Sequence, residues 1–373
     1  GSKGGKIYCY DKEKVLCRTI PDDLSLSGRK LMDNINVYCL IFDDSDNLWV
    51  ATKGKGLFAL KDILDTPVQD MEIVHFDVHL SRMLDEVFSI IQDDHGQFWI
   101  GSHISGVGLL RDPFTNPTFE SFSKEKYNLA SDQIRYFFND KSGNLWIGGA
   151  DGISFLKADQ LTSDKKDFKI IQSNREESSS LVYPNVACIF QSEDSSIFAA
   201  TLGGGISRLS MKNIRDERWE WENFNTDDGL SSNMVYSILE DKENNLWMST
   251  SNGINRFNPT TKAFENFFVE KTAILNYFTE SCGVSTSEGE IIFGNSKGFL
   301  YFNPMSVVKD SSRYPVVLSR FMVNGNEILP KASDLLDKSI EFEDQIELKH
   351  LQNSFQIEFS VLDYRDPDKI QFS

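Results

Sequence analysis

The stretch Asn245-Leu246-Trp247-Met248-Ser249-Thr250, followed by Gly253-Ile254, is one copy of a phrase that recurs along the chain. Each copy has an apolar strand that ends in an acidic turn, a second strand centred on a large apolar residue that is aromatic in five of the six copies, and a glycine that opens a third strand. The other copies are centred on Trp49, Trp99, Trp146, Phe198 and Ile292. Successive centres are separated by 50, 47, 52, 49 and 45 residues. A period of about 48 residues with four short strands is the size of a propeller blade.

Each repeated residue type has a structural role in such a blade. The stretch Asp140-Lys141-Ser142-Gly143-Asn144 predicts a tight hairpin turn, where a positive φ favours Gly or Asn. The tryptophan is predicted to fill the wedge between neighbouring blades, and the small residue after it leaves room for close backbone approach. The alternative, a ligand-stacking platform, is less favoured because a residue repeated once per blade is typical of packing.

The N-terminal residues read as the latter half of a blade. Gly4-Gly5-Lys6-Ile7-Tyr8-Cys9-Tyr10-Asp11 matches the third strand, and Val15-Leu16-Cys17-Arg18 matches the outer one. We therefore predict an all-β chain with a β-propeller of four-stranded blades, of the seven-bladed type, with six near-complete blades and a partial one. Since an open propeller leaves strand edges exposed, the partial blade is expected to close the ring. The propeller is assigned to residues 1–304.

The C-terminal region has a different pattern. Tyr314-Pro315-Val316-Val317-Leu318-Ser319-Arg320-Phe321-Met322-Val323-Asn324-Gly325 alternates polar and apolar residues, and so does the stretch from Asn353 to Tyr364. Short alternating strands fit a β-sandwich. Residues 305–373 are therefore predicted to begin an immunoglobulin-like sandwich that is incomplete at Ser373.

Composition limits the partners. The formal net charge of −18 repels phosphate backbones, which argues against nucleic acid. No apolar run approaches the roughly 20 residues that span a bilayer, so membrane contact is expected only through a segment outside this sequence. The five cysteines match no metal motif, and most are predicted to be buried thiols. A bridge between Cys9 and Cys17 stays open.

The repeats resemble a known family. Leu145-Trp146-Ile147-Gly148, its acidic turn and the blade entry Asp228-Gly229-Leu230-Ser231-Ser232-Asn233-Met234-Val235 look like two-component regulator propeller repeats, over roughly residues 4–304. The tail resembles the start of the triple-tyrosine domain that follows such propellers.

This resemblance implies a periplasmic propeller, then a triple-tyrosine domain, one membrane helix and a cytoplasmic histidine kinase. Many members are hybrid receptors of Bacteroides-like bacteria that sense oligosaccharides. By the resemblance, this chain is the extracytoplasmic sensing part of such a hybrid two-component sensor. It would bind an oligosaccharide, form a homodimer in the full-length receptor and have no kinase activity of its own.

The candidate ligand-binding residues lie on one face of the predicted propeller. The loops that join the fourth strand to the next blade and the second strand to the third share that face, around the channel. Aromatic rings stack on sugars, and Arg, Asn and His bind hydroxyls or a carboxylate. Ordinary loop surface is the alternative reading. The candidates are Lys53, Arg82, His103, Arg135, Tyr136, Tyr183, Asn252, Tyr277 and Asn295.

Catalytic and metal signatures are absent from the sequence. The five histidines form no ligand pattern, no Gly-x-Ser-x-Gly elbow occurs, and the acidic turns lack the terminal glutamate of a calcium loop. We therefore predict no catalytic residue, no metal and no cofactor. Carboxylates are nonetheless too abundant to exclude a glycosidase or lyase pair. A propeller enzyme acting on a polysaccharide and a protein-binding scaffold remain the alternatives.

Overall fold

The structure is a computed structural model. It describes residues 1, 6–11, 13, 16–20, 25–26, 29–30, 36–63, 66–67, 70–267, 278–307, 316–332 and 334–361. The chain divides into two compact units, Gly1–Ser306 and Val307–Ser373.

Antiparallel sheets of consecutive strands build the first unit. The first sheet contains β5 (Asn36–Phe42), β6 (Leu48–Lys53), β7 (Leu57–Leu60) and β8 (Ile73–Phe76). The second contains β9 (Val87–Gln92), β10 (Phe98–Ser102), β11 (Val107–Arg111) and β12 (Thr118–Phe122). The third contains β13 (Ile134–Asn139), β14 (Leu145–Gly149), β15 (Gly152–Leu156) and β16 (Lys169–Ile171).

Three further sheets follow in the same order. The fourth contains β17 (Val186–Gln191), β18 (Ile197–Thr201), β19 (Ile206–Leu209) and β20 (Glu222–Phe224). The fifth contains β21 (Val235–Glu240), β22 (Leu246–Thr250), β23 (Gly253–Asn258) and β24 (Ala263–Phe267). The sixth has three strands, β25 (Phe278–Ser285), β26 (Ile291–Asn295) and β27 (Gly298–Phe302). Short helices occur only in connections of the described chain, as η2 (Arg82–Asp85), α1 (Lys124–Tyr127), η3 (Ala158–Gln160), α2 (Met211–Arg215), η4 (Thr226–Asp228) and η5 (Pro304–Ser306).

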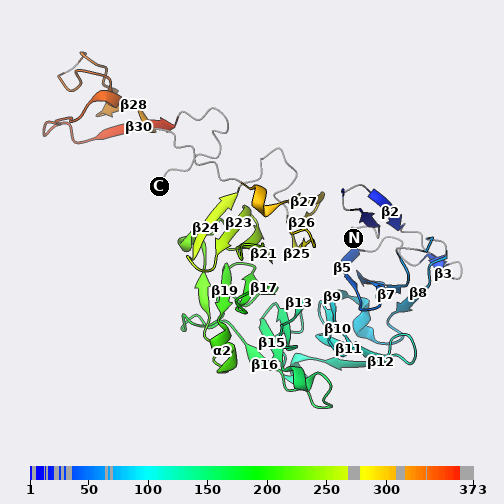
Figure 1. The fold of residues 1–373 in the computed structure, drawn as a ribbon. Helices are drawn as coiled ribbons and strands as arrows, with labels where there is room; N and C mark the ends of the chain where they lie inside the picture. Colours follow the sequence, from blue (N-terminus) through cyan, green and yellow to red (C-terminus); the bar gives the residue numbers. More distant parts are fainter. Residues whose placement is uncertain are drawn as a thin grey trace. The chain divides into compact units, whose positions relative to one another are not determined.

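The first strands of successive sheets contact one another, from β5 to β9, β13, β17, β21 and β25. Figure 1 shows these strands innermost in the first unit, with the later strands of each sheet lying progressively farther out. Strands β17 and β25, which are not neighbours in this order, also contact each other. The sheets are therefore blades around a common axis, and the predicted all-β class with four-stranded blades is confirmed.

A two-stranded hairpin, β1 (Ile7–Tyr10) and β2 (Leu16–Ile20), lies between the sixth and first blades. Ile7 and Ile20 are buried in one cluster with residues of the first blade. The Tyr10 ring meets Phe299 of the sixth blade edge-on, with ring centroids 5.2 Å apart. The partial N-terminal blade thus sits in the gap that would otherwise expose two edges. Strands β3 (Ser25–Leu26) and β4 (Arg29–Lys30) form a further small hairpin.

The repeated tryptophans lie between the blades, as predicted. Trp49, Trp99 and Trp146 are 0% exposed and Trp247 is 1% exposed. Trp99, for example, shares a buried cluster with Leu145 of β14 in the next blade. Phe198 takes this place in the fourth blade, where it packs with Met248 of the fifth. The repeated aromatic residues therefore form the core between the blades.

The predicted turn and close-approach residues also have the expected geometry. Gly96 and Gly143 have φ of 75° and 76° in the turns between the first and second strands. A Cβ at Gly101 would lie 2.3 Å from Ser89 Oγ and 2.7 Å from Ile134 Cγ2 of the next blade. The small residue after the tryptophan therefore allows the close packing of adjacent sheets.

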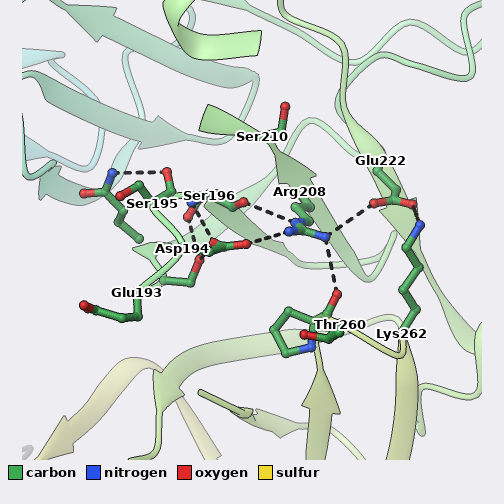
Figure 2. A network of polar contacts seen from close by, with 12 residues as sticks. Glu193, Asp194, Ser195, Ser196, Arg208, Ser210, Glu222, Thr260 and Lys262 are labelled. Atoms are coloured by element: carbon green, nitrogen blue, oxygen red, sulfur yellow. Dashed lines mark hydrogen bonds and ion pairs between the residues drawn. The ribbon is translucent and has the colours of Figure 1, made fainter. Parts of the chain in front are cut away.

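The fourth blade, which lacks the tryptophan, is held by an arginine network (Figure 2). Arg208 of β19 donates to Asp194 Oδ2 at 2.7 Å and to Ser196 Oγ at 3.3 Å. It also donates to the Pro259 carbonyl at 3.4 Å, which links the fourth blade to the fifth. Its guanidinium carbon lies 5.7 Å from the centroid of the Phe198 ring. Arg208 therefore covers the smaller ring that stands where other blades have an indole.

The second unit contains one three-stranded sheet in the order β29-β28-β30. These strands are β28 (Val316–Val323), β29 (Asn326–Glu327) and β30 (Phe355–Val361), with the short helix η6 (Ile340–Phe342) beside them. Phe321, Val323, Leu336 and Ile340 form its buried cluster. The immunoglobulin-like sandwich stays a prediction, and its last residues, 362–373, lie outside the described part. None of the helices in the described residues is long and apolar enough to cross a membrane.

Candidate functional site

The innermost strands carry an irregularity at the same place in each of the first five blades. The pairing of the first and second strands shifts register there by one residue, so that an extra residue stands out of the ladder. A β-bulge re-aims the extra side chain and is common next to functional sites. The extra residues are Tyr38, Phe88, Arg135, Ala187 and Tyr236. In β25 the shift is longer, between Phe278 and Gly283.

These bulges lie near the start of each innermost strand, at the end of the channel where the second strands finish. We call this end the channel mouth. It is the face on which the sequence placed its candidate residues.

Aromatic rings follow one another along part of the channel mouth. The rings of Tyr38 and Phe88 have centroids 4.9 Å apart. Phe88 in turn stacks with His103, at 5.6 Å. Tyr38 is exposed, and the other two rings are half-buried. A partly exposed row of rings can stack on an apolar ligand face.

A charged pair crosses the channel from the third blade to the sixth. Arg135 Nη1 donates to Glu280 Oε2 at 2.6 Å, between residues 145 positions apart in sequence. The adjacent Ser281 hydroxyl donates to the Ala187 carbonyl of the fourth blade at 2.6 Å. Burial and then the nearby Glu280 carboxylate raise the pKa of Tyr236 above its ordinary value. Strand β25 therefore brings a carboxylate to the centre of the channel, beside an arginine and a tyrosine.

The structure brings two of the candidate residues, Lys53 and His103, to Glu86 in the connection before β9. Lys53 Nζ lies 3.8 Å from Glu86 Oε1. The His103 amide donates to the Glu86 carbonyl at 3.2 Å. Arg82 lies in η2, the short helix of the same connection. These residues form the rim of the channel mouth next to the aromatic row.

Tyr136 is in a different place from the one predicted. The sequence placed Arg135 and Tyr136 on a loop, but both lie on strand β13. Tyr136 packs against two hydrophobic clusters, one between the third and fourth blades and one between the fourth and fifth. The nearby Cys188 thiol, together with burial, raises the pKa of Tyr136 well above its ordinary value. Tyr136 therefore belongs to the packed interior between blades and not to the loop surface.

The remaining candidates are dispersed. Tyr183 is exposed and lies over Gly203 and Gly204. Asn252 is exposed in a turn and donates to the Ser231 carbonyl at 3.3 Å. Asn295, at the end of β26, has a buried Nδ2 with no partner among the described residues. Tyr277 lies outside the described residues.

Four residues of the channel mouth were missed by sequence reasoning: Tyr38, Phe88, Tyr236 and Glu280. The first three share a sequence signal, since each lies two positions before the apolar core of an innermost strand. A reading that assigned strict alternation to these strands could not find the bulge. Glu280 has no such signal, because its role depends on its distance from Arg135.

The cysteines and acidic turns show no ligand set. No group of His, Cys, Asp and Glu residues that could hold a metal occurs in the described ranges. Cys188 is buried on β17, and burial raises the pKa of its thiol to about 11. Cys9 stands opposite Arg18 in the β1–β2 ladder, while the side chain of Cys17 lies outside the described part. A Cys9–Cys17 bridge therefore remains open.

This fold and its repeated phrase define a class. The family model described as two component regulator propeller matches residues 30–54, 128–151 and 229–252. These ranges cover the innermost and second strands of the first, third and fifth blades. The protein is a β-propeller, and three of its blades match the two-component regulator propeller model, in agreement with the resemblance that the sequence indicated.

A curated protein and a solved structure also resemble this chain. A curated relative, histidine kinase P4 of Formosa agariphila, is 22% identical over 380 residues, which cover 100% of this chain and 26% of the relative. The extracellular domain of hybrid two-component system BT3049 from B. thetaiotaomicron has a TM-score of 0.68 and 23% identity, over 98% of this chain and 45% of that one.

An enzyme also shares the fold. Virginiamycin B lyase from Staphylococcus aureus has a TM-score of 0.55 and 13% identity, over 80% of this chain and 87% of the lyase. This chain thus spans about a quarter of the kinase relative, at 26%, and under half of the BT3049 chain, at 45%. The structural likenesses establish the propeller fold.

Proposed function

We propose that this chain is the ligand-sensing region of a hybrid two-component sensor histidine kinase, located in the periplasm, and that it binds an oligosaccharide at the channel mouth. The kinase relative and the BT3049 ectodomain support the sensor role. The observation that carries the binding site is the row of Tyr38, Phe88 and His103 along that mouth. Half-exposed rings beside polar side chains are typical of sugar sites.

The blade architecture suits a sensor. The channel mouth collects side chains from several blades, so a ligand there contacts residues far apart in sequence. Signalling requires that the ligand bind one arrangement of the receptor more tightly than another. In the full-length receptor, a homodimer, the ligand would favour one relative placement of the two protomers, and the change would pass to the kinase through the segments that follow.

A thermal-shift screen of this chain against a library of oligosaccharides tests the proposal. A ligand that binds only the folded state raises the melting temperature. For a hit, Tyr38→Ala and Phe88→Ala should each weaken binding by roughly five- to tenfold, because each removes about 1–1.4 kcal/mol of stacking.

The same strand offers a matched control. Phe42 is 53% exposed at the other end of β5, away from the channel mouth, so Phe42→Ala should leave binding unchanged. No shift with any oligosaccharide would contradict the proposal. Turnover of a hit in place of simple binding would support the enzyme alternative, and a stable complex with a protein alone would support the scaffold alternative.

A further inference from the structure

We propose that the channel mouth recognises a ligand bearing a carboxylate, and that Glu280 occupies the anion position on Arg135 until the ligand displaces it. This inference deepens the proposed function and rests on it. It is carried by an arginine whose hydrogen-bonding capacity is largely unused among the described residues and by a carboxylate that engages it through a single oxygen.

Arg135 is under-satisfied. A guanidinium has five N–H donors in a planar fork that suits a carboxylate bound through both oxygens. The structure describes one hydrogen bond from Arg135, Nη1 to Glu280 Oε2 at 2.6 Å. Its Nε is buried with no partner among the described residues, and the side chain is only 16% exposed. A buried donor left unpaired costs free energy, which a better-placed acceptor would recover.

The structural arginines of other blades provide the comparison. Arg111 donates from Nε to Gln97 and from both Nη atoms to Glu120. Arg208 uses Nε, Nη1 and Nη2 in its network (Figure 2), and Arg256 uses Nε and Nη2 on Glu265. All three engage Nε and lie on third strands, away from the channel. Arg135 differs from them in both respects, which separates it from the arginines that only brace the blades.

Glu280 is positioned to leave. It accepts through a single oxygen, and its side chain is 32% exposed. It lies inside the register shift of β25, between the paired residues Phe278 and Gly283, so no registered β25–β26 pair has to break when it moves. Displacement exchanges one carboxylate for another at Arg135 and releases the first to water, so the charge at the site is conserved.

Two more unpaired polar groups lie in the fourth and sixth blades, at the strand ends that face the channel mouth. Asn185, just before β17, has a buried Oδ1 and Asn295, at the end of β26, has a buried Nδ2, each without a partner among the described residues. The Oδ1 of Asn185 can accept a hydrogen bond from a ligand hydroxyl, and the Nδ2 of Asn295 can donate one. The unused donors of Arg135 fit the carboxylate of a sugar acid.

The test compares D-glucuronate with its neutral methyl ester, which has the same ring but no charge. Binding is measured by titration calorimetry on the wild-type chain and on Glu280→Gln. Removing the competing carboxylate should tighten glucuronate binding by roughly tenfold, while the ester binds weakly to both. Arg135→Gln should abolish the preference for the acid, and Arg135→Lys, which keeps the charge but loses the fork, should reduce it. Glu120→Gln breaks a comparable pair on Arg111 and should leave binding at the wild-type level.

Equal binding of acid and ester, no tightening in Glu280→Gln, or no glucuronate binding by that variant would each overturn the inference. These failures are distinct from failure of the proposed function. If neutral oligosaccharides bind at the aromatic row while glucuronate does not, the sensor proposal stands and the carboxylate inference falls. If Glu280→Gln binds glucuronate but no oligosaccharide binds the wild type, the carboxylate inference stands and the sensor proposal falls.

Discussion

The indole Nε1 of Trp247 donates a hydrogen bond to Oδ2 of Asp241 over 2.7 Å. The same bond, between an aspartate and the tryptophan six residues later, recurs in three other blades, in the pairs Asp43–Trp49, Asp93–Trp99 and Asp140–Trp146. Where the indole is missing, the aspartate is missing as well. Ser192 precedes Phe198 and Thr286 precedes Ile292 at the same spacing.

The physical reason is that a buried indole N–H needs an acceptor, whereas a phenyl or alkyl group does not. In the fourth blade the Ser192 hydroxyl bonds the Ser196 carbonyl within the turn. The aspartate of the acidic turn therefore has two functions, turn formation and satisfaction of the indole.

The first prediction concerns this pair in the fifth blade. Asp241→Ser and Trp247→Phe should each lower the free energy of unfolding by about 1–3 kcal/mol. The double variant, which reproduces the residues of the fourth blade, should cost less than the sum, because a phenyl ring at this position needs no acceptor. Urea denaturation in a double-mutant cycle measures the coupling. Strict additivity would contradict the paired role.

The second prediction concerns close approach between blades. Gly101→Ala should destabilise the protein by about 1–3 kcal/mol, since its Cβ would overlap Ser89 Oγ at 2.3 Å and Ile134 Cγ2 at 2.7 Å. Gly298→Ala is the control, because a Cβ there meets nothing within 4 Å. Its effect should stay within about 0.5 kcal/mol. Thermal unfolding of both variants checks the difference, and equal effects would argue against tight packing at Gly101.

The third prediction concerns a contact between adjacent blades. The last residue of an innermost strand accepts from the turn of the preceding blade: Gln92 from the Asp44 amide at 2.9 Å, and Gln191 from the Lys141 amide at 2.7 Å. Glu240 does the same with the Glu193 amide at 3.0 Å. Burial, outweighing the hydrogen bond from Glu193, raises the pKa of Glu240 above its ordinary value. Glu240→Gln keeps the acceptor and removes the buried charge.

A carboxyl whose pKa is raised by folding stabilises the fold most at low pH, and that contribution is lost as pH rises through the folded pKa. Glu240→Gln should therefore match the wild type near pH 4 and exceed its stability by roughly 0.5 kcal/mol at pH 7. Gln191→Glu is the converse variant and should be less stable than the wild type at pH 7. The free energy of unfolding measured against pH tests this prediction. A loss of stability in Glu240→Gln at pH 7 would show that the Glu240 charge does not destabilise the fold.

The fourth prediction concerns the stability of the protein at acidic pH. Burial of Asp43 opposes its ionisation, but hydrogen bonds from Trp49 and Asn47 outweigh burial and lower the pKa of Asp43 below its ordinary value. A carboxyl with a lowered folded pKa contributes stability that is complete above the unfolded value and is lost as pH falls through the folded one. The wild type should therefore lose stability below about pH 4, and Asp43→Asn should show a shallower loss there. Parallel curves for the two proteins would contradict this assignment.

Much of the fold follows from short-range pattern. The spacing from Trp49 to Trp247, the acidic turns and the small residues after each aromatic all express rules that act within a few residues. Period-two burial, positive φ in a turn and the volume of a ring are local properties, so one blade can be recognised without the others. The blade contents and the buried indoles were therefore predictable.

The sequence predicted which face of the propeller holds the candidate residues, but not the contacts between them. Arg135 was expected there, but its partner Glu280, which comes from another blade, was not. The bulge that turns Tyr38 and Phe88 toward each other adds one residue to an otherwise regular strand, and alternation alone places those side chains wrongly. Tyr136 was assigned to a connecting loop, whereas it lies on strand β13.

The chain's own order of residues determines that it forms blades, where each blade turns, and that an aromatic ring fills the wedge in five of the six repeats, because these features depend on neighbours along the chain. Closure around the axis decides which bulged side chains face one another, and so places Arg135 against Glu280. That pairing depends on the distance between the two side chains in space. The closed ring of sheets fixes this distance, and the order of residues along the chain does not reveal it.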